Sequence, residues 1–246
     1  MSIRILCGSA GSPGVTATAL GCTLTHPGPT LLVDGSCDGS QAILAGFLGG
    51  ASAAGVGIEE FARRTRMGAS FDLIAATIPL DGGQGHHRLM PGFGHLGAVD
   101  LFEGSWPTLA EELRRVADSG IEVIVDAGRV GDGTRMAALL ARADEVTLVA
   151  RTGLRHLAAA RAACDRLDEL LTRGPRVVTR GLALVGEGRP YDRREVEHLF
   201  GWPTRLVLPW LPDHAAVLTD GAPPPRRWQR SPLLAACRAH MEEVAA

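Results

Sequence analysis

Residues 3–16 read IRILCGSAGSPGVT. The apolar run Ile3–Cys7 predicts a buried strand, the Gly/Ser-rich residues 8–14 predict a loop, and the small residues of Val15–Leu24 predict a helix. A Pro-Gly-Pro turn then ends the helix, and Thr30–Val33 predicts a second strand. A strand, loop, helix and strand in this order favour a parallel sheet.

The same alternation continues along the chain. The continuous apolar run Ile121–Val125 is typical of a central strand buried on both faces. Residues 50–104 are harder to interpret, apart from a helix at Ile58–Arg66 and a short apolar patch at Arg88–Met90. Further strands are predicted at Glu145–Ala150, Gly181–Val185 and Arg205–Leu208, and further helices at Gln41–Phe47, Thr134–Arg142, Leu154–Leu171, Arg193–Phe200 and Pro232–Val244.

Another helix is expected to start near Ser105-Trp106-Pro107, with Ser105 as its N-cap and Pro107 in its first turn. We find no internal repeat and no linker. The sequence therefore predicts one α/β domain over residues 1–246. Its expected architecture is a three-layer, doubly wound, mostly parallel sheet of about seven strands with helices on both faces.

The composition is that of a globular protein, with 46% hydrophobic and 21% charged residues. The net charge of -2 gives no overall basic field for nucleic acid or anionic lipid, so direct nucleic-acid binding is not expected. All 25 basic residues are arginine, and the sequence contains neither lysine nor asparagine. No step that needs a lysine ammonium or an asparagine amide can therefore occur within this chain.

Five scattered cysteines without a C-x-x-C pair do not predict a disulfide framework or a zinc site. No apolar run reaches the roughly 20 residues of a membrane span, and no signal segment is recognisable. The expected location is the cytoplasm. The C-terminal helix lacks a basic polar face, so an amphipathic membrane anchor is not expected either.

The Gly-rich loop partly matches a phosphate-binding motif. The motif reads G-x-x-x-x-G-K-[ST], and its backbone amides together with a helix N-terminus bind phosphate. Only Gly14 and Thr16 match its key positions, and Val15 occupies the lysine position. Taken alone, the loop is equally consistent with a structural turn.

The wider chain resembles the MinD/ParA-like family of P-loop ATPases, whose deviant Walker A loop reads K-G-G-x-G-K-T. Residues 10–16 correspond to that loop, residues 31–39 (LLVDGSCDG) to its switch segment, and residues 121–126 (IEVIVD) to its Walker B strand. Residues 184–191 and 208–210 are similar to a MinD-like group seen in actinobacteria. The resemblance covers nearly the whole chain except about residues 50–104.

The resemblance implies an ATP or ADP site with Mg²⁺. Its cofactor-binding residues would be Gly11, Ser12, Pro13, Gly14, Val15 and Thr16. Thr16 and Asp126 would hold Mg²⁺, and Asp34 and Asp126 would be the catalytic carboxylates if the site is active. The family's two loop lysines are replaced by Ala10 and Val15, which removes about 2–5 kcal/mol of interaction with phosphate.

Several other residues bear on this site. Ser36 stands where the family usually has a second acidic residue, and Asp38 is a candidate substitute. Arg129 and Arg151 follow strand ends and are candidates to replace the lysines, although solvated arginines fit the pattern better. A partner protein is another possible source of the cation.

Three further clusters have simpler interpretations. The histidines His86, His87 and His95 invite a metal site, but a surface loop is favoured. The pair Asp213-His214 is predicted to cap a helix. The basic residues 226–230 (RRWQR) fit a solvated loop better than a contact with nucleic acid or an acidic partner.

Three functions remain open. The first is a degenerate MinD/ParA-like scaffold or adaptor in spatial organisation, such as chromosome or plasmid partitioning, division-site placement, or pilus or secretion assembly. It would have protein partners, and any homodimer would be independent of nucleotide. The second is a slow or partner-activated ATPase. The third is a module that binds another anion at the helix N-terminus. The missing lysines favour the first.

Overall fold

The computed structural model describes residues 1–11, 14–68, 72–131 and 134–245. These residues form an eight-stranded sheet in the order β3-β4-β2-β5-β1-β6-β7-β8. All neighbouring strands are parallel except β3 and β4. The strands are β1 (Ile3–Gly8), β2 (Thr30–Asp34), β3 (Ile78–Pro79), β4 (His87–Met90), β5 (Glu122–Arg129), β6 (Glu145–Arg151), β7 (Thr179–Val185) and β8 (Thr204–Leu208). The predicted doubly wound, mostly parallel sheet is confirmed, with eight strands instead of about seven.

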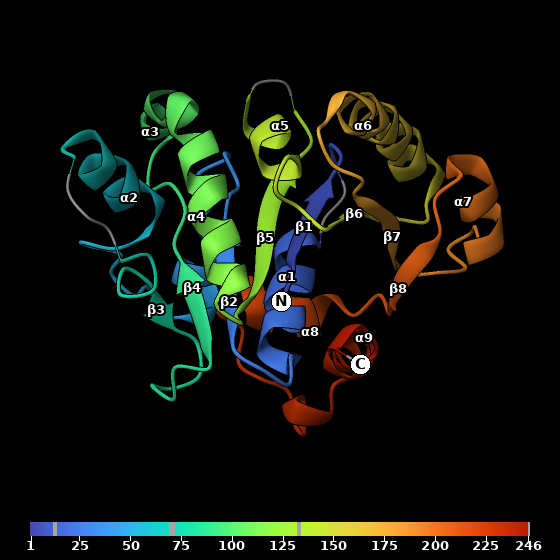
Figure 1. Cartoon of the computed structure of the whole chain (residues 1–246). Helices are drawn as coiled ribbons and strands as arrows, with labels where there is room; N and C mark the ends of the chain where they lie inside the picture. The colour runs from blue at the N-terminus through green and yellow to red at the C-terminus, as the bar shows by residue number, and fades with distance from the viewer. Residues whose placement is uncertain (12–13, 69–71, 132–133, 246) are drawn as a thin grey trace.

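Helices cover both faces of this sheet. Figure 1 shows α5 and α6 on the opposite side of the sheet from α8 and α9. The helices are α1 (Val15–Thr25), α2 (Gly57–Arg66), α3 (Leu96–Phe102), α4 (Trp106–Asp118), α5 (Thr134–Leu140), α6 (Leu154–Arg173), α7 (Arg193–Phe200), α8 (Pro212–Thr219) and α9 (Pro232–Ala245). Three short turns, η1 (Ile43–Phe47), η2 (Glu103–Ser105) and η3 (Trp228–Arg230), complete the elements of the described residues.

Alternate residues of each central strand feed two hydrophobic cores. Ile5 packs in the core beneath α2 and α4–α7, whereas Leu6 packs in the core beneath α1, η1, α8 and α9. On β5, Val125 and Ile124 divide between the cores in the same way. This alternation explains the continuous apolar runs in the sequence, because both faces of each strand are buried.

The region that the sequence left open is built on aromatic packing. Phe93, Phe102 and Trp106 are each about 1% exposed. The rings of Phe102 and Trp106 meet edge to face, with centroids 4.7 Å apart. Phe93 packs edge to face on both. These contacts hold α3 and the start of α4 against β4 and replace a regular periodic pattern, which is why the segment was difficult to predict.

Two predictions of helix capping have different outcomes. Ser105 occupies the N-cap position of α4 and Pro107 lies in its first turn, as predicted. Ser105 has helical backbone angles, however, and its side chain makes no capping bond, because the chain runs straight from η2 into α4. The pair Asp213-His214 lies inside α8, a helix that was not predicted. His214 Nδ1 instead lies 2.6 Å from Ser231 Oγ, which links α8 to the start of α9.

A glycine sets the distance between η1 and α8. A Cβ atom at Gly46 would overlap the carbonyl oxygen of Thr219 at the end of α8. The predicted helix Gln41–Phe47 is accordingly a short π-helical turn, Ile43–Phe47, pressed against α8. Within the described ranges, no helix has both the length and the apolar character needed to cross a bilayer.

Candidate functional site

A cavity of about 490 Å³ lies at the carboxyl ends of the central parallel strands, and we call it the loop cavity. Gly8 at the end of β1, Ser36 after β2 and Gly128 on β5 line it. The carboxyl ends of parallel strands are where open α/β sheets bind their ligands. The fold therefore places the Gly-rich loop at this general ligand site.

The N-terminus of α1 opens into the loop cavity. Gly14 is the N-cap residue, with a φ of 119° that favours glycine, and it offers no side chain to the first-turn amides. Val15 and Thr16 follow it and line the cavity. No acidic residue lies in this first turn, so nothing in the helix itself neutralises the positive end of its dipole. This arrangement suits an anion.

Two carboxylates lie behind the cavity wall at the ends of neighbouring strands. Asp34 ends β2 and is paired in register with Asp126 of β5. Asp126 is fully buried, and its Oδ1 accepts a 2.8 Å hydrogen bond from the Gly128 amide. Among the described residues, its Oδ2 is buried without a hydrogen-bond partner. A buried carboxylate oxygen without a partner is costly, and a cation or a water bound beside it would offset that cost.

Burial and mutual repulsion change the acidity of this pair. Burial, followed by the neighbouring charge of Asp126, raises the pKa of Asp34 to about 7. Burial also raises the pKa of Asp126, against hydrogen bonding from the Thr16 side chain and the Gly128 amide. Two like charges this close to one another do not ionise independently. The pair is therefore poised to gain or lose a proton near neutral pH.

The switch loop supplies a third carboxylate to the cavity. Asp38 Oδ1 accepts hydrogen bonds from Ser36 Oγ at 2.7 Å and from the Ser40 amide at 3.2 Å. Partial burial acts to raise the pKa of Asp38, but these bonds and the charge of Arg129 outweigh it and lower the pKa. Asp38 lines the cavity together with Ser36. The sequence left the direction of Asp38 open, and the structure places it at the site.

The structure adds one buried cation that the sequence did not reveal. Arg135 on α5 is only 8% exposed. Its guanidinium donates 2.8 Å hydrogen bonds to the backbone oxygens of Gly35 and Arg129. Its charge also opposes, without cancelling, the rise that burial causes in the pKa of Asp126. Arg135 thus ties the loop after β2 to the end of β5 from beneath the cavity, a role that only the three-dimensional fold makes visible.

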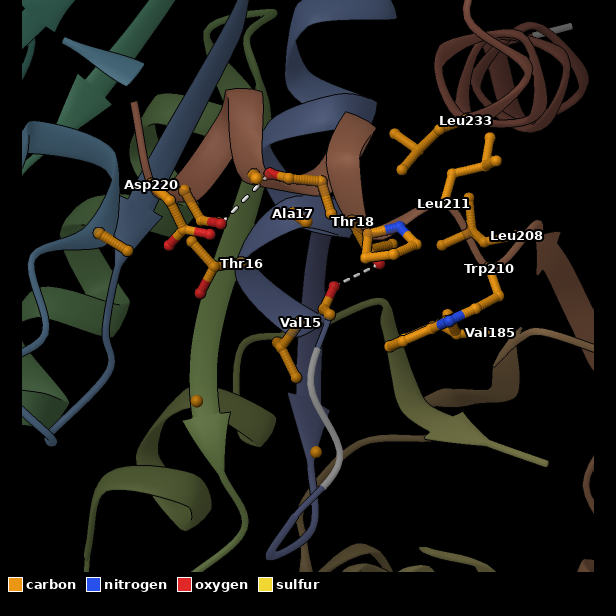
Figure 2. Close-up of a pocket in the computed structure, with 18 of the residues that line it drawn as sticks. Val15, Thr16, Ala17, Thr18, Val185, Leu208, Trp210, Leu211, Asp220 and Leu233 are labelled. Atoms are coloured by element: carbon orange, nitrogen blue, oxygen red, sulfur yellow. Dashed lines mark hydrogen bonds between the residues drawn. The ribbon is translucent and has the colours of Figure 1, made fainter. Parts of the chain in front are cut away.

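The far end of the loop cavity is apolar. Figure 2 shows Val185, Leu208, Trp210, Leu211 and Leu233 gathered on one side, and Val15 and Thr16 on the other. This end lies where strands β7 and β8 end and where α8 and α9 approach α1. A polar end at a helix N-terminus without a side-chain cap and an apolar end with an indole suit a ligand that has an anionic part and a planar apolar part.

The predicted site residues fall into three groups. Gly11, Gly14, Val15 and Thr16 line the cavity, as does Arg129, whereas Asp34 and Asp126 lie just behind its wall. Ser12 and Pro13 lie outside the described residues. Arg151 does not line this cavity; its guanidinium carbon lies 3.7 Å from the centroid of the Trp210 ring. Arg151 therefore does not stand where a loop lysine would.

The histidine cluster has no shared site. His87 Nδ1 lies 2.8 Å from Thr30 Oγ1, and the His95 side chain accepts a hydrogen bond from the Ala98 amide at the start of α3. In the described part of the chain, no three His, Cys, Asp or Glu side chains are placed to hold a metal ion together. The predicted surface loop is wrong for two of the three residues, because His87 belongs to β4 and His95 caps α3. The backbone amide of His86 donates a 2.7 Å hydrogen bond to Asp81 Oδ2.

No protein-family model matches the sequence, and no curated protein matches it significantly. Solved structures do match over the full length. A ParA family ATPase from Chlorobium tepidum TLS has a TM-score of 0.73 at 15% identity, with 99% of this chain and 98% of that chain covered. The fold is that of MinD/ParA proteins.

Two more structures of the MinD/ParA fold extend the comparison. MinD in the MinC:MinD cell division protein complex of Aquifex aeolicus has a TM-score of 0.71 at 14% identity, covering 99% of this chain and 96% of that one. The Cyanothece McdA(D38A)–ATP complex has a TM-score of 0.73 at 14% identity, covering 100% and 96%. The fold expected from the sequence resemblance is therefore confirmed, and the identities establish the fold alone.

Proposed function

We propose that this protein is a degenerate MinD/ParA-like scaffold or adaptor in spatial organisation, with weak or no ATP hydrolysis. The supporting observation is the set of residues that surround the loop cavity. Its free helix N-terminus and the carboxylates behind it match a phosphate and Mg²⁺ site, but Val15 brings no charge to the phosphate position. Phosphoryl transfer depends on neutralising the phosphates, so the loss weakens hydrolysis first.

The oxygen donors around the cavity fit Mg²⁺. Asp126 Oδ2 is a buried oxygen that lacks a partner, and the Thr16 hydroxyl lies beside this carboxylate. Mg²⁺ prefers oxygen ligands and keeps several of its waters. In this proposal Thr16 would bind the ion directly, and Asp126 would orient one of its waters. The ion would neutralise part of the phosphate charge.

The apolar end of the cavity would receive the base of a nucleotide. Trp210 and Leu211 provide a planar and an aliphatic surface there. A stacked base is worth about 1–3 kcal/mol, and it would add to the interaction of the phosphates with the helix N-terminus to give weak nucleotide binding. Weak binding without efficient hydrolysis is the behaviour that the proposal assigns to this chain.

The spatial-organisation role is carried over from proteins of the same fold. They include a ParA family ATPase and a MinD bound to the division protein MinC. We propose that this chain likewise acts through a protein partner. Any homodimer would form without a bridging nucleotide, and light scattering with and without ATP would test that point.

The second candidate is a slow or partner-activated ATPase. It is supported by Arg129, which is exposed and lines the cavity near Asp38. In this version Arg129 or a partner's cation replaces the loop lysine. Turnover that stays at the background rate with every candidate partner would argue against it.

Calorimetric titration with ATP and ADP, with and without Mg²⁺, tests the proposal directly. We expect a dissociation constant in the high micromolar range or weaker and no measurable steady-state turnover. Tight, Mg²⁺-dependent binding together with hydrolysis would overturn the degenerate-site proposal and favour the second candidate. An Asp126→Ala variant should lose any Mg²⁺ dependence that is seen.

A further inference from the structure

A second cavity, of about 260 Å³, lies beside the loop cavity. It is formed by the junction of β6 and α6, residues 151–156, and by Gly186 and Arg189 after β7. Trp210 and Val185 line both cavities. We call the second one the arginine cavity, because Arg151, Arg155 and Arg189 all line it.

Among the described residues, none of the three arginines lies within ion-pair distance of a carboxylate. Further along α6, by contrast, Arg161 pairs with Asp165 at 3.1 Å. Like charges around one cavity repel one another, so a bound anion would relieve this repulsion.

The nearest carboxylates along the chain are already engaged elsewhere. Glu187 Oε1 accepts a hydrogen bond of 3.0 Å from the Arg193 amide. Asp192 is the N-cap of α7 and accepts from the Glu195 amide at 2.9 Å. Neither residue lines the arginine cavity. The positive charge there is therefore not offset by a neighbouring loop.

The start of α6 adds to the positive potential. This helix of 20 residues begins in the cavity wall, and its N-cap is Gly153, which has no side chain to accept from the first-turn amides. Its first turn contains no acidic residue. A helix N-terminus stabilises an anion, and here it does so in addition to three arginines.

Two of the three guanidinium groups are held in place without a ligand. Arg151 stacks over the Trp210 ring at 3.7 Å. Arg155 Nε donates to His156 Nε2 at 3.2 Å, and its two terminal nitrogens have no acceptor among the described residues. His156 is 6% exposed and also hydrogen-bonds to the backbone of Gly11. Groups that are ordered in advance lose less entropy when they bind.

We propose that the arginine cavity is a binding site for a phosphate-type oxyanion, held by Arg151, Arg155 and Arg189 at the N-terminus of α6. Guanidinium forks match the oxygens of phosphate, and three of them suit a dianion better than a single carboxylate. The occupant is free phosphate or a small phosphomonoester. The site is separate from the loop cavity, so the proposal stands whether or not nucleotide binds there.

The test is calorimetric titration with inorganic phosphate in low-salt buffer without Mg²⁺. The unmodified protein is compared with Arg155→Gln/Arg189→Gln, which removes two of the three charges. The matched control is Arg173→Gln/Arg194→Gln, which removes two exposed charges away from both cavities. Arg129→Gln reports on the loop cavity. Glycerol phosphate serves as a second probe.

We expect saturable phosphate binding that weakens at least tenfold in Arg155→Gln/Arg189→Gln and is unchanged in the control and in Arg129→Gln. Tighter binding of glycerol phosphate than of inorganic phosphate would support an ester as the occupant, and the reverse would support the free ion. The proposal is overturned if phosphate does not bind, if Arg155→Gln/Arg189→Gln binds it normally, or if only Arg129→Gln weakens it. None of these outcomes decides whether ATP binds, which the separate ATP titration measures.

Discussion

The two cavities that share Trp210 and Val185 differ in the charged side chains that line them. The loop cavity has Asp38 and Asp220 in its wall beside the single cation Arg129, with Asp34 and Asp126 behind it, and the residues of its phosphate loop that the structure describes bring no cation. The arginine cavity has three guanidinium groups and no paired carboxylate among the described residues. The cluster of arginines at this edge of the sheet therefore lies around the start of α6 and not in the loop before α1.

The largest expected effect comes from restoring the missing charge. Val15→Lys places an ammonium in the wall of the loop cavity, and it should tighten ATP binding by about 2–5 kcal/mol, or two to four decades. Val15→Met provides similar length without charge and should change little. Calorimetry with Mg-ATP makes the measurement. If the two variants bind ATP equally, the missing cation is not what limits ATP binding in the loop cavity.

The second effect tests the buried cation beneath the loop cavity. Arg135→Met leaves the backbone oxygens of Gly35 and Arg129 without their donors. We expect the free energy of unfolding to fall by roughly 2–4 kcal/mol, because buried acceptors are left unpaired. Urea denaturation measures this, with the exposed Arg194→Met as the control. If the free energy of unfolding falls no further than in Arg194→Met, Arg135 does not hold the loop after β2 against the end of β5.

The third effect concerns pH. The pKa of Asp34 is about 7 in the folded protein and about 4 in an unfolded chain. Between these values the folded state keeps a proton that the unfolded state releases. The protonated Asp34 carboxyl therefore contributes fully to the free energy of unfolding below about pH 4, and this contribution is lost as the pH rises through 7.

Asp34→Asn removes this dependence. Relative to the unmodified protein, the variant should gain about 2–3 kcal/mol of stability between pH 5 and pH 8. Urea denaturation at both pH values measures the gain, and Asp100→Asn on the exposed face of α3 is the control. If the difference in unfolding free energy between Asp34→Asn and the unmodified protein is the same at pH 5 and pH 8, the pKa of Asp34 is not raised by its surroundings.

The smallest effect concerns the wall between the cavities. Arg151→Met removes the stacking on Trp210 and should cost about 0.5–1 kcal/mol of stability. Arg189→Met should cost less, because no hydrogen bond or ion pair of its side chain is found in the described ranges. A double-mutant cycle with Trp210→Leu isolates the stacking energy. A coupling energy of zero would leave Arg151 as a solvated arginine, the interpretation that its sequence context favours.

Local patterns made the centre of the fold predictable. Ile3–Cys7 and Ile121–Val125 are continuous apolar runs because their strands are buried on both faces, and the predicted bounds lie within a few residues of β1 and β5. The loop cavity was predictable for the same reason, since the loop directly follows β1. By contrast, α8 was missed because its apolar and polar residues are not segregated into two clear faces.

The arginine cavity depends on contacts between distant parts of the chain. Arg155 lies at the start of α6, just after β6, and Arg189 lies in the loop after β7. Because β6 and β7 pair in parallel, the segments that follow them meet at the same edge of the sheet. Arg135 is similar, because one of its acceptors, Gly35, follows β2 and the other, Arg129, ends β5. The strand order needed to bring such residues together is a property of the whole sheet. Counting arginines after strand ends identified Arg129 and Arg151 but could not show which cavity each one faces.

Trp210 links the two cavities, because a substitution of this residue changes the walls of both. Its ring forms part of both walls and carries Arg151 on one face. A substitution of Trp210 alters both cavities at once. Selection for ligand binding in one cavity therefore also restricts this residue in the other. We therefore expect descendants of this protein to vary at Val15 or Arg189, each of which belongs to one cavity, before they vary at the indole.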